Sequence, residues 1–137
     1  MVMGSGHLHD CDLNDLLTHA QHIFLVDIAH PLELYWHRAR QKGRITLISR
    51  DLSFALESAL LGRTDIDAPD PAFLNDFKNC DLVISLNLLS QLPIGAHNIW
   101  SHQGLEETRL EALSGTIIQN HLALLKDAQN ALLISDH

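Results

Sequence analysis

The chain has few of the features that assign a protein to a special compartment. Its two cysteines, Cys11 and Cys80, are too few for a disulfide framework, so a reduced cytoplasmic location is expected. No apolar run reaches the ~18 residues that a membrane-spanning helix requires, which argues against a membrane partner. No basic segment followed by an apolar one opens the chain, as it would in a signal peptide. The sequence therefore predicts a cytoplasmic protein.

Positive charge is scarce as well. Nine Lys and Arg residues stand against seventeen Asp and Glu residues, and the net charge is -8 with neutral histidines. This balance argues against a nucleic-acid partner, because sequence-independent binding to backbone phosphates needs clustered cations. The main basic group lies at the end of a predicted helix, where cations complement the helix dipole, and a phosphate-binding patch is the alternative. Its members are Arg38, Arg40, Lys42 and Arg44.

Metal-ligand spacing is also missing, although the chain has ten histidines. His7, His9 and Asp10 could begin a metal site, but no second pair has the spacing typical of zinc ligands. We therefore predict no metal centre. His121 falls on the apolar side of a predicted helix and is interpreted as a core or interface histidine.

What the chain does have is a regular alternation of apolar runs and helical patterns. The expected strands are residues 1–3, 23–26, 45–48, 82–86 and 131–135. The expected helices are residues 13–21, one that begins at Pro31 and ends before Gly43, a short one capped by Ser53 that ends at Leu61, residues 72–77 and residues 106–128. Such alternation predicts parallel strands joined by right-handed crossovers. We expect a single α/β domain over residues 1–137, with a doubly wound, mainly parallel five-stranded sheet of order 3-2-1-4-5 and helices on both faces.

Several local patterns add detail to this expectation. Asp12 and Asp70 are placed to cap helices. Residues 93–104 are expected to form a loop, and Gly115 in the long helix indicates close packing or a kink. The last strand, residues 131–135, should be an exposed edge that a homodimer or a further C-terminal segment would cover. The helix after Pro31 has one apolar stripe at helical spacing, made of Leu32, Tyr35, Trp36 and Ala39.

Polar residues and glycines mark the ends of the expected strands. Gly4-Ser5-Gly6 follows the first strand, where a glycine turn lets the backbone approach a ligand closely. Asp27 follows the second strand, at about the distance from these glycines at which dinucleotide sites place an acid for the ribose hydroxyls. The alternative for Asp27 is an ordinary helix-capping acid. Asp51, after the third strand, either accepts from an adenine amino group or simply ends the strand.

Four short segments occur along the chain in a recognisable order. They read V-M-G-S-G-H-L, F-L-V-D, T-L-I-S-R-D-L and D-L-V-I-S-L-N-L-L-S-Q-L-P. In this order and spacing the chain resembles the class I S-adenosylmethionine-dependent methyltransferases over nearly its whole length. The last segment, from Asp81 to Pro93, is similar to that family's fourth motif, which lies beside the transferable methyl group.

For the first and fourth strands, the resemblance implies contacts with the methyl-bearing end of S-adenosylmethionine. Gly4, Ser5 and Gly6 would let the backbone pass close to the methionine portion. Asn87 and its neighbours would lie near the sulfonium and the methyl acceptor.

For the second and third strands, the resemblance implies contacts with the adenosine. Asp27 would hold both ribose hydroxyls, and Ile28 would lie against the adenine. Asp51 and the Leu52 backbone would read the adenine edge.

The chain departs from the family at several positions. Val2 stands where the family usually has an acid, and Leu8 stands where it often has a third glycine. Asn87 is followed by Leu88 and Leu89 in place of Pro-Pro-aromatic, so methylation of a nucleobase or glutamine nitrogen is not indicated. The family's sheet also has two further strands after the fifth and helices before the first, which suggests a chain shortened at both ends.

The resemblance predicts methyl transfer from S-adenosylmethionine to an unidentified small-molecule or protein acceptor. Two alternatives stay open. One is a catalytically inactive or partial domain that serves as a nucleotide-binding or protein-interaction module. The other is a nicotinamide-dinucleotide-binding domain, which is weakened because His9 stands where the G-x-G-x-x-G pattern requires its last glycine.

No catalytic residue is assigned from the sequence. The sulfonium is already activated, so the protein mainly has to align the nucleophile and exclude water. His30, His97 and His102 are candidate bases by residue type alone, and each is better interpreted as a surface or loop histidine. Trp100 either walls a substrate pocket or packs in the core.

Overall fold

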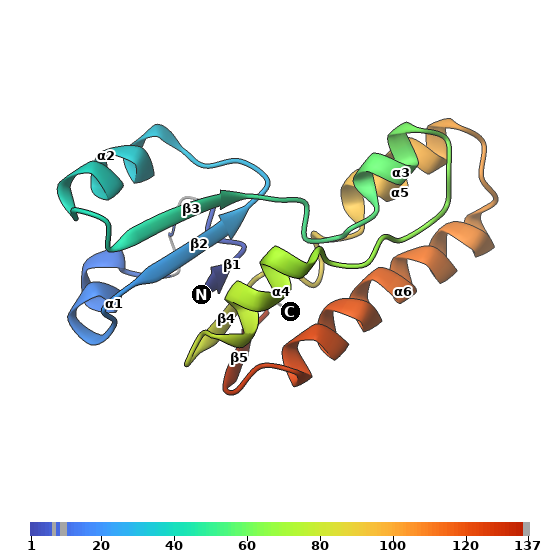
Figure 1. Cartoon of the computed structure of the whole chain (residues 1–137). Coiled ribbons are helices and arrows are strands. Elements are labelled where there is room, and N and C mark those ends of the chain that lie inside the picture. Colours follow the sequence, from blue (N-terminus) through green and yellow to red (C-terminus); the bar gives the residue numbers. More distant parts are fainter. Residues whose placement is uncertain (7, 9–10, 136–137) are drawn as a thin grey trace.

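A computed structural model describes residues 1–6, 8 and 11–135 of the chain, and Figure 1 shows how they are arranged. The described residues form a five-stranded sheet in which neighbouring strands run parallel. The strand order is β3-β2-β1-β4-β5, which confirms the predicted α/β class and order. The strands are β1 (Val2–Met3), β2 (Ile23–Asp27), β3 (Ile45–Ser49), β4 (Val83–Leu86) and β5 (Ala131–Ile134).

Helices cover both faces of the sheet, as predicted. Successive residues of a strand point to opposite faces, and here Met3 and Val26 join a core shared with α3 to α6. Their neighbours Val2 and Leu25 join a second core with α1 and α2. Together these features define a Rossmann-like fold. The helices are α1 (Leu13–His19), α2 (Leu32–Arg40), α3 (Leu56–Leu60), α4 (Pro71–Lys78), α5 (Ile94–His102) and α6 (Glu107–Lys126).

Carboxylate caps begin α1 and α4 where the sequence predicts them. Asp12 accepts a hydrogen bond from the Asn14 amide at 2.8 Å, and Asp70 accepts one from the Phe73 amide at 2.8 Å. Each bond satisfies a backbone N–H group that the first turn of a helix otherwise leaves without an acceptor. Helix α1 ends at His19, two residues before the predicted end.

The prediction that residues 93–104 form a loop is wrong, because most of this segment is helix α5. Glycine, asparagine, serine and histidine dilute its apolar pattern, which is why the sequence did not predict a helix. Ala96 and Trp100, four residues apart, are nevertheless both buried on one face of the helix. Trp100 also donates its indole N–H to the Arg63 carbonyl oxygen at 2.7 Å. Packing and one partly buried hydrogen bond therefore decide the structure of this segment.

Two further expectations concern α6. His121 is 3 % exposed, which confirms it as a core histidine. Of the two interpretations of Gly115, a kink or close packing, close packing is wrong, because a Cβ atom added there would meet no described atom within 4 Å. None of the helices in the described part of the chain is long and apolar enough to cross a membrane.

Candidate functional site

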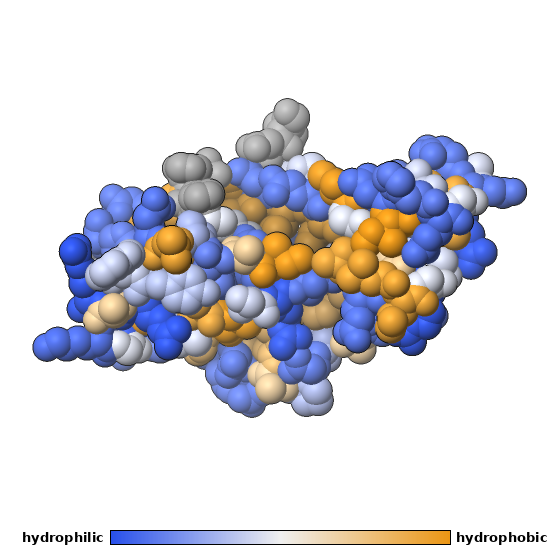
Figure 2. Space-filling model, turned by 90° about the horizontal axis from the view of Figure 1, so that it is seen from above, coloured by the Kyte–Doolittle hydropathy of each residue, from blue (hydrophilic) through white to orange (hydrophobic). Residues whose placement is uncertain are grey.

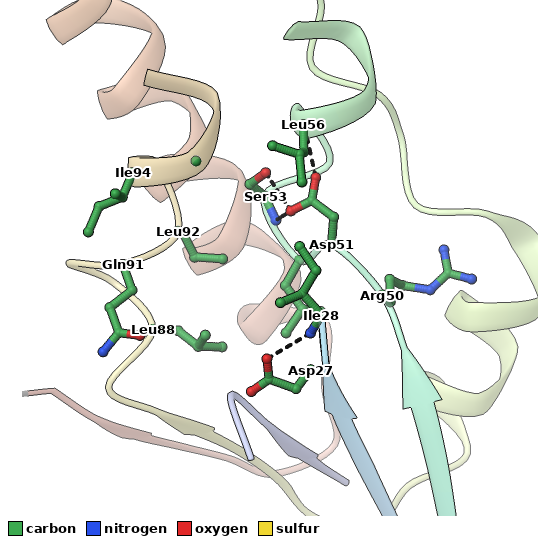
Figure 3. A pocket seen from close by; sticks show the side chains of 12 residues that line it. Asp27, Ile28, Arg50, Asp51, Ser53, Leu56, Leu88, Gln91, Leu92 and Ile94 are labelled. Carbon is green, nitrogen blue, oxygen red and sulfur yellow. Dashed lines mark hydrogen bonds between the residues drawn. The ribbon is translucent and has the colours of Figure 1, made fainter. Parts of the chain in front are cut away.

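A pocket of about 400 Å³ opens at the carboxyl ends of β2, β3 and β4 (Figure 3). One wall comes from residues 27–28 and 50–56, which follow β2 and β3. The facing wall comes from residues 88–95, between β4 and the first turn of α5. In the space-filling view from above, apolar surface gathers between the half of the molecule that holds the sheet and the half that holds α3 and α5 (Figure 2). The pocket is therefore mainly apolar with a few polar groups, as small-molecule sites usually are.

The structure brings half of the predicted site residues together in this pocket. Asp27, Ile28, Asp51 and Leu52 line it, and they come from the strand ends that were predicted to hold adenosine. The remaining four do not belong to its lining, although they follow the neighbouring strands β1 and β4. They are Gly4, Ser5, Gly6 and Asn87.

Asp27 ties the glycine turn after β1 to the end of β2. Its Oδ2 atom accepts a hydrogen bond from the Gly6 amide at 2.8 Å. Its Oδ1 atom accepts one from the Ile28 amide at 2.7 Å. Because each oxygen of a carboxylate can accept two hydrogen bonds, each keeps one acceptor position in addition to these contacts. Asp27 is partly exposed and faces the pocket, so those positions are accessible to a ligand.

Contacts within the chain itself explain why position 4 is a glycine. Gly4 has φ +74°, and a Cβ atom there would lie 2.5 Å from the Leu86 carbonyl oxygen. Gly4 is thus required for close contact between the turn and β4. At Gly6, with φ +38°, an added Cβ would lie 4.0 Å from Asp27 Oδ2, which is an ordinary contact. Between them, the Ser5 hydroxyl is buried without a hydrogen-bond partner among the described residues.

Asp51 holds the turn that leads into α3, and its acceptor positions are used within the chain. Its Oδ1 atom accepts from the Ser53 amide and hydroxyl, at 2.9 and 2.6 Å. Its Oδ2 atom accepts from the Ala55 and Leu56 amides, at 3.2 and 2.9 Å. The prediction that Ser53 itself caps this helix is wrong, since α3 begins three residues later. These four bonds favour the structural alternative for Asp51, because an adenine amino group would have to displace one of them.

Asn87 links β4 to the edge strand. Its backbone has φ +47°, and its amide donates to the Ile134 carbonyl oxygen at 2.8 Å. The residue that follows, Leu88, is buried and forms part of the pocket wall. The turn after β4 therefore directs Leu88 into the site and leaves Asn87 outside the pocket lining.

Sequence reasoning missed Arg50, which also lines the pocket. Its side chain points away from the cavity and toward α4 (Figure 3), where it forms an ion pair with Asp70. The Arg50 guanidinium lies 5.1 Å from the centre of the Phe73 ring. The Phe73 amide hydrogen bond and the Arg50 charge hold the pKa of Asp70 below its usual range. Arg50 thus fixes α4 to the end of β3.

The facing wall of the pocket was also missed. It includes Gln91, Leu92, Ile94 and Gly95, all in or next to the segment that was expected to be a loop. A Cβ atom added to Gly95 would lie 3.3 Å from Leu56 Cδ1, so α5 begins close to α3. The spacing of Ala96 and Trp100 is the one sequence signal that could have revealed this helix and its wall.

The candidate bases make contacts with other parts of the chain. His30 Nε2 is 3.0 Å from the Ile48 carbonyl oxygen, and His102 Nδ1 is 2.6 Å from the Asn98 carbonyl oxygen. His97 Nδ1 is 3.3 Å from the Ser114 hydroxyl. None of these three histidines lines the described pocket. Trp100 is fully buried, so its packing role is confirmed.

No cluster of three or more metal-binding side chains occurs among residues 1–6, 8 and 11–135. The sequence pattern of His7, His9 and Asp10 lies outside the described residues. Comparison with protein-family models, with curated proteins and with solved structures finds no match to this chain. The fold and the pocket are therefore the features from which a function can be inferred.

Proposed function

We propose that the pocket binds the adenosine portion of S-adenosylmethionine and that the protein transfers its methyl group to a small-molecule or protein acceptor. The observation that carries this proposal is the place of Asp27. It lies at the carboxyl end of β2 and lines an apolar pocket beside β1 and β4, where the strand order reverses. Doubly wound sheets bind their ligands at this point.

The chemistry of Asp27 suits a ribose. Two adjacent hydroxyl groups need two acceptors a short distance apart, and the two carboxylate oxygens each keep one acceptor position. The bonds from the Gly6 and Ile28 amides hold the carboxylate in place, so it is positioned before a ligand arrives. A ribose bound there would lie between the glycine turn and the pocket.

The apolar walls suit a purine ring. Ile28 lies on one side of the pocket, and Leu88 and Leu92 lie on the other (Figure 3). Leu52, which is 5 % exposed, adds a further apolar side chain to the lining. A volume of about 400 Å³ is large enough for a nucleoside and lies in the usual range for small-molecule sites.

The methionine portion would extend from the ribose toward the turn at Gly4, Ser5 and Gly6. S-adenosylmethionine supplies a methyl group on a positively charged sulfur, which is activated without help from a protein base. The contribution of this chain is then to hold the nucleoside, to order the turn through the bond from the Gly6 amide to Asp27, and to exclude water with apolar walls. The buried Ser5 hydroxyl is a further polar group on this side of the site.

A second candidate is a nucleotide-binding or protein-interaction module without methyl transfer. Two observations favour it. The space beside Gly4 is filled by the chain itself. The four bonds to Asp51 also use the acceptor positions that would read an adenine edge.

Calorimetric titration with S-adenosylmethionine, S-adenosylhomocysteine and NAD tests both candidates. The titration uses the unmodified protein, Asp27→Ala and Asp27→Asn, with Asp65→Ala as a control for loss of an exposed acid. Loss of hydrogen bonds to a charged group should weaken binding of the two sulfur compounds by about 10- to 100-fold in Asp27→Ala. Asp65→Ala should bind like the unmodified protein. Circular dichroism checks that each variant is folded.

Each result of the titration has a defined meaning. Binding of both sulfur compounds that depends on Asp27 supports the proposal, and transfer of a labelled methyl group to acceptor mixtures then tests catalysis. Binding without transfer supports the module. Tight binding of NAD alone would favour the nicotinamide-dinucleotide alternative. Absence of heat with all three compounds would overturn the proposed site.

A further inference from the structure

The charged side chains in the described lining of the pocket are engaged within the chain. Asp27 accepts from two backbone amides, and its remaining acceptor positions are those proposed for the ribose. The two carboxylate oxygens of Asp51 accept from four donors. Arg50 points toward α4 and forms an ion pair with Asp70 (Figure 3). These three charges therefore serve the ribose and the fold, and none is directed at a base.

Two neutral polar side chains also line the pocket, and they differ in their contacts. Ser53 donates its hydroxyl to Asp51 at 2.6 Å and accepts from the Ala55 amide at 3.2 Å. The Gln91 carboxamide makes no hydrogen bond to the residues that the structure describes. Gln91 is also exposed, so a ligand can reach its side chain. In the described lining, Gln91 is therefore the polar side chain whose donor and acceptor are both unused.

The turn that carries Gln91 is fixed by backbone hydrogen bonds. The Gln91 and Leu92 amides both donate to the Leu88 carbonyl oxygen, at 2.9 and 2.8 Å. The Ile94 amide donates to the Gln91 carbonyl oxygen at 3.1 Å. Leu88 and Leu92 are buried, whereas Gln91 is exposed. The turn therefore directs two leucines into the wall and holds the carboxamide at the mouth of the pocket.

The two walls suit the faces of a flat ring, and the mouth suits its polar edge. Figure 3 shows Leu88, Gln91 and Leu92 on one side of the cavity and Asp27 and Ile28 on the other. The leucines and Ile28 offer apolar contacts, which do not distinguish one base from another. A polar group among apolar walls is what fixes the orientation and the identity of a ligand. Gln91 is in the position to do so.

We propose that Gln91 recognises the adenine, with its carboxamide bonded to the exocyclic amine and to a ring nitrogen next to it. This inference rests on the proposed nucleoside site. A carboxamide carries an acceptor and a donor side by side. Adenine offers the matching pair, an amine that donates and a ring nitrogen that accepts, and glutamine binds such an edge through two hydrogen bonds. Gln91 thereby takes the base-reading role that the sequence suggested for Asp51.

Calorimetric titration of the full chain with adenosine and with purine riboside tests this contact. Purine riboside is the analogue of adenosine that lacks the exocyclic amine. For the unmodified protein, loss of the amine should weaken binding about three- to tenfold, which is the effect of one neutral hydrogen bond. Gln91→Ala should bind adenosine about tenfold more weakly than the unmodified protein does. This variant should bind the two ligands within about twofold of each other, because the amine has lost its acceptor.

Gln91→Glu separates a direct contact from a structural role. A carboxylate keeps an acceptor for the amine but has no donor for the ring nitrogen. This variant should therefore bind adenosine more weakly than the unmodified protein does and still prefer it over purine riboside. Gln119→Ala removes an exposed glutamine side chain on α6 and should match the unmodified protein in both titrations. Thermal unfolding checks that each variant is folded.

The possible results separate the role of Gln91 from the proposed function. Suppose that adenosine binding depends on Asp27, but that Gln91→Ala keeps the full preference for the amine. That result would overturn the role of Gln91 and leave the nucleoside site in place. A preference that is lost in Asp51→Ala and kept in Gln91→Ala would return the base-reading role to Asp51. Absence of binding for both adenosine and S-adenosylhomocysteine would overturn the site itself.

Discussion

His121 Nε2 lies 2.8 Å from the Ser85 hydroxyl oxygen and joins α6 to β4 inside the core. Both residues are buried, and the other ring nitrogen, Nδ1, has no hydrogen-bond partner among the described residues. A charged imidazole in this position would lose its hydration, and its Nδ1–H group would have no acceptor among the described residues. Desolvation accordingly lowers the pKa of His121 to about 4.

This pair predicts a loss of stability in mild acid. The unfolded chain takes up a proton on this histidine below about pH 6.5, but the folded protein does so only below about pH 4. The stabilising contribution of neutral His121 is therefore complete above pH 6.5 and is lost as the pH falls toward 4. We expect a decrease of about 3 kcal/mol in the free energy of unfolding over this range, measured by urea denaturation.

Two variants separate His121 from the other titrating groups. His121→Gln cannot take up a proton in this range, so its stability should change less between pH 6.5 and 4. His19→Gln changes a histidine whose side chain is 80 % exposed and should follow the unmodified protein. Equal slopes for His121→Gln and the unmodified protein would contradict the assignment.

Gly4→Ala should be severely destabilising. The substitution forces an alanine to adopt φ +74° and places its Cβ atom 2.5 Å from a backbone oxygen of Leu86. Gly62→Ala is the matched control, because Gly62 has φ +72° and open space around it. We expect a loss of about 1 kcal/mol for Gly62→Ala and at least ~3 kcal/mol for Gly4→Ala. Similar losses in chemical denaturation would show that the turn does not approach β4 as closely as described.

Asp51→Asn tests the two roles that the sequence left open for Asp51. As the acceptor for the amides that lead into α3, the carboxylate should contribute about 1 to 2 kcal/mol to stability, and the variant should lose much of it. If the role is structural, the loss appears in thermal unfolding, while the affinity for S-adenosylhomocysteine changes little. Lost affinity with an unchanged melting temperature would instead indicate that the carboxylate reads the adenine.

Gly115→Ala should stabilise the protein. Gly115 lies inside the 20-residue helix α6, and an added methyl group would meet open space. Replacing a helical glycine by alanine contributes up to ~1 kcal/mol. The expected result is a rise in melting temperature of about 3 °C by differential scanning calorimetry. A fall would reveal a contact at Gly115 that the described structure does not contain.

The order of the sheet could be predicted because its strands carry a strong local signal. Strand β2 is a continuous apolar run in which Leu25 and Val26 are both buried, one on each face. Such runs, with helices between them, allow few arrangements besides a doubly wound sheet. Helix α5 has no comparable apolar pattern in its sequence. Its position depends on the burial of Trp100, which comes from packing against other elements.

Half of the predicted site residues line the pocket, because strand ends also carry a local sequence signal. Asp27 and Asp51 follow strands, and strand ends in such a sheet meet at one edge. The wall around Leu92 is positioned by the packing of α5 against its neighbours, which a sequence pattern does not specify. The sequence also could not predict that the apolar stripe of α2 faces solvent. Periodicity identifies a helical face but not the side on which the sheet lies.

The chain's two tryptophans lie in opposite environments. Trp100 is fully buried and donates to a backbone oxygen, whereas Trp36 is 69 % exposed on α2. Their fluorescence therefore separates into two reporters within one molecule. Trp100 should follow loss of the core during denaturation, whereas Trp36 should emit like an indole in water both in the folded and in the unfolded chain. Trp36→Phe and Trp100→Phe would assign the two signals, and the protein thus needs no added dye to report on its core.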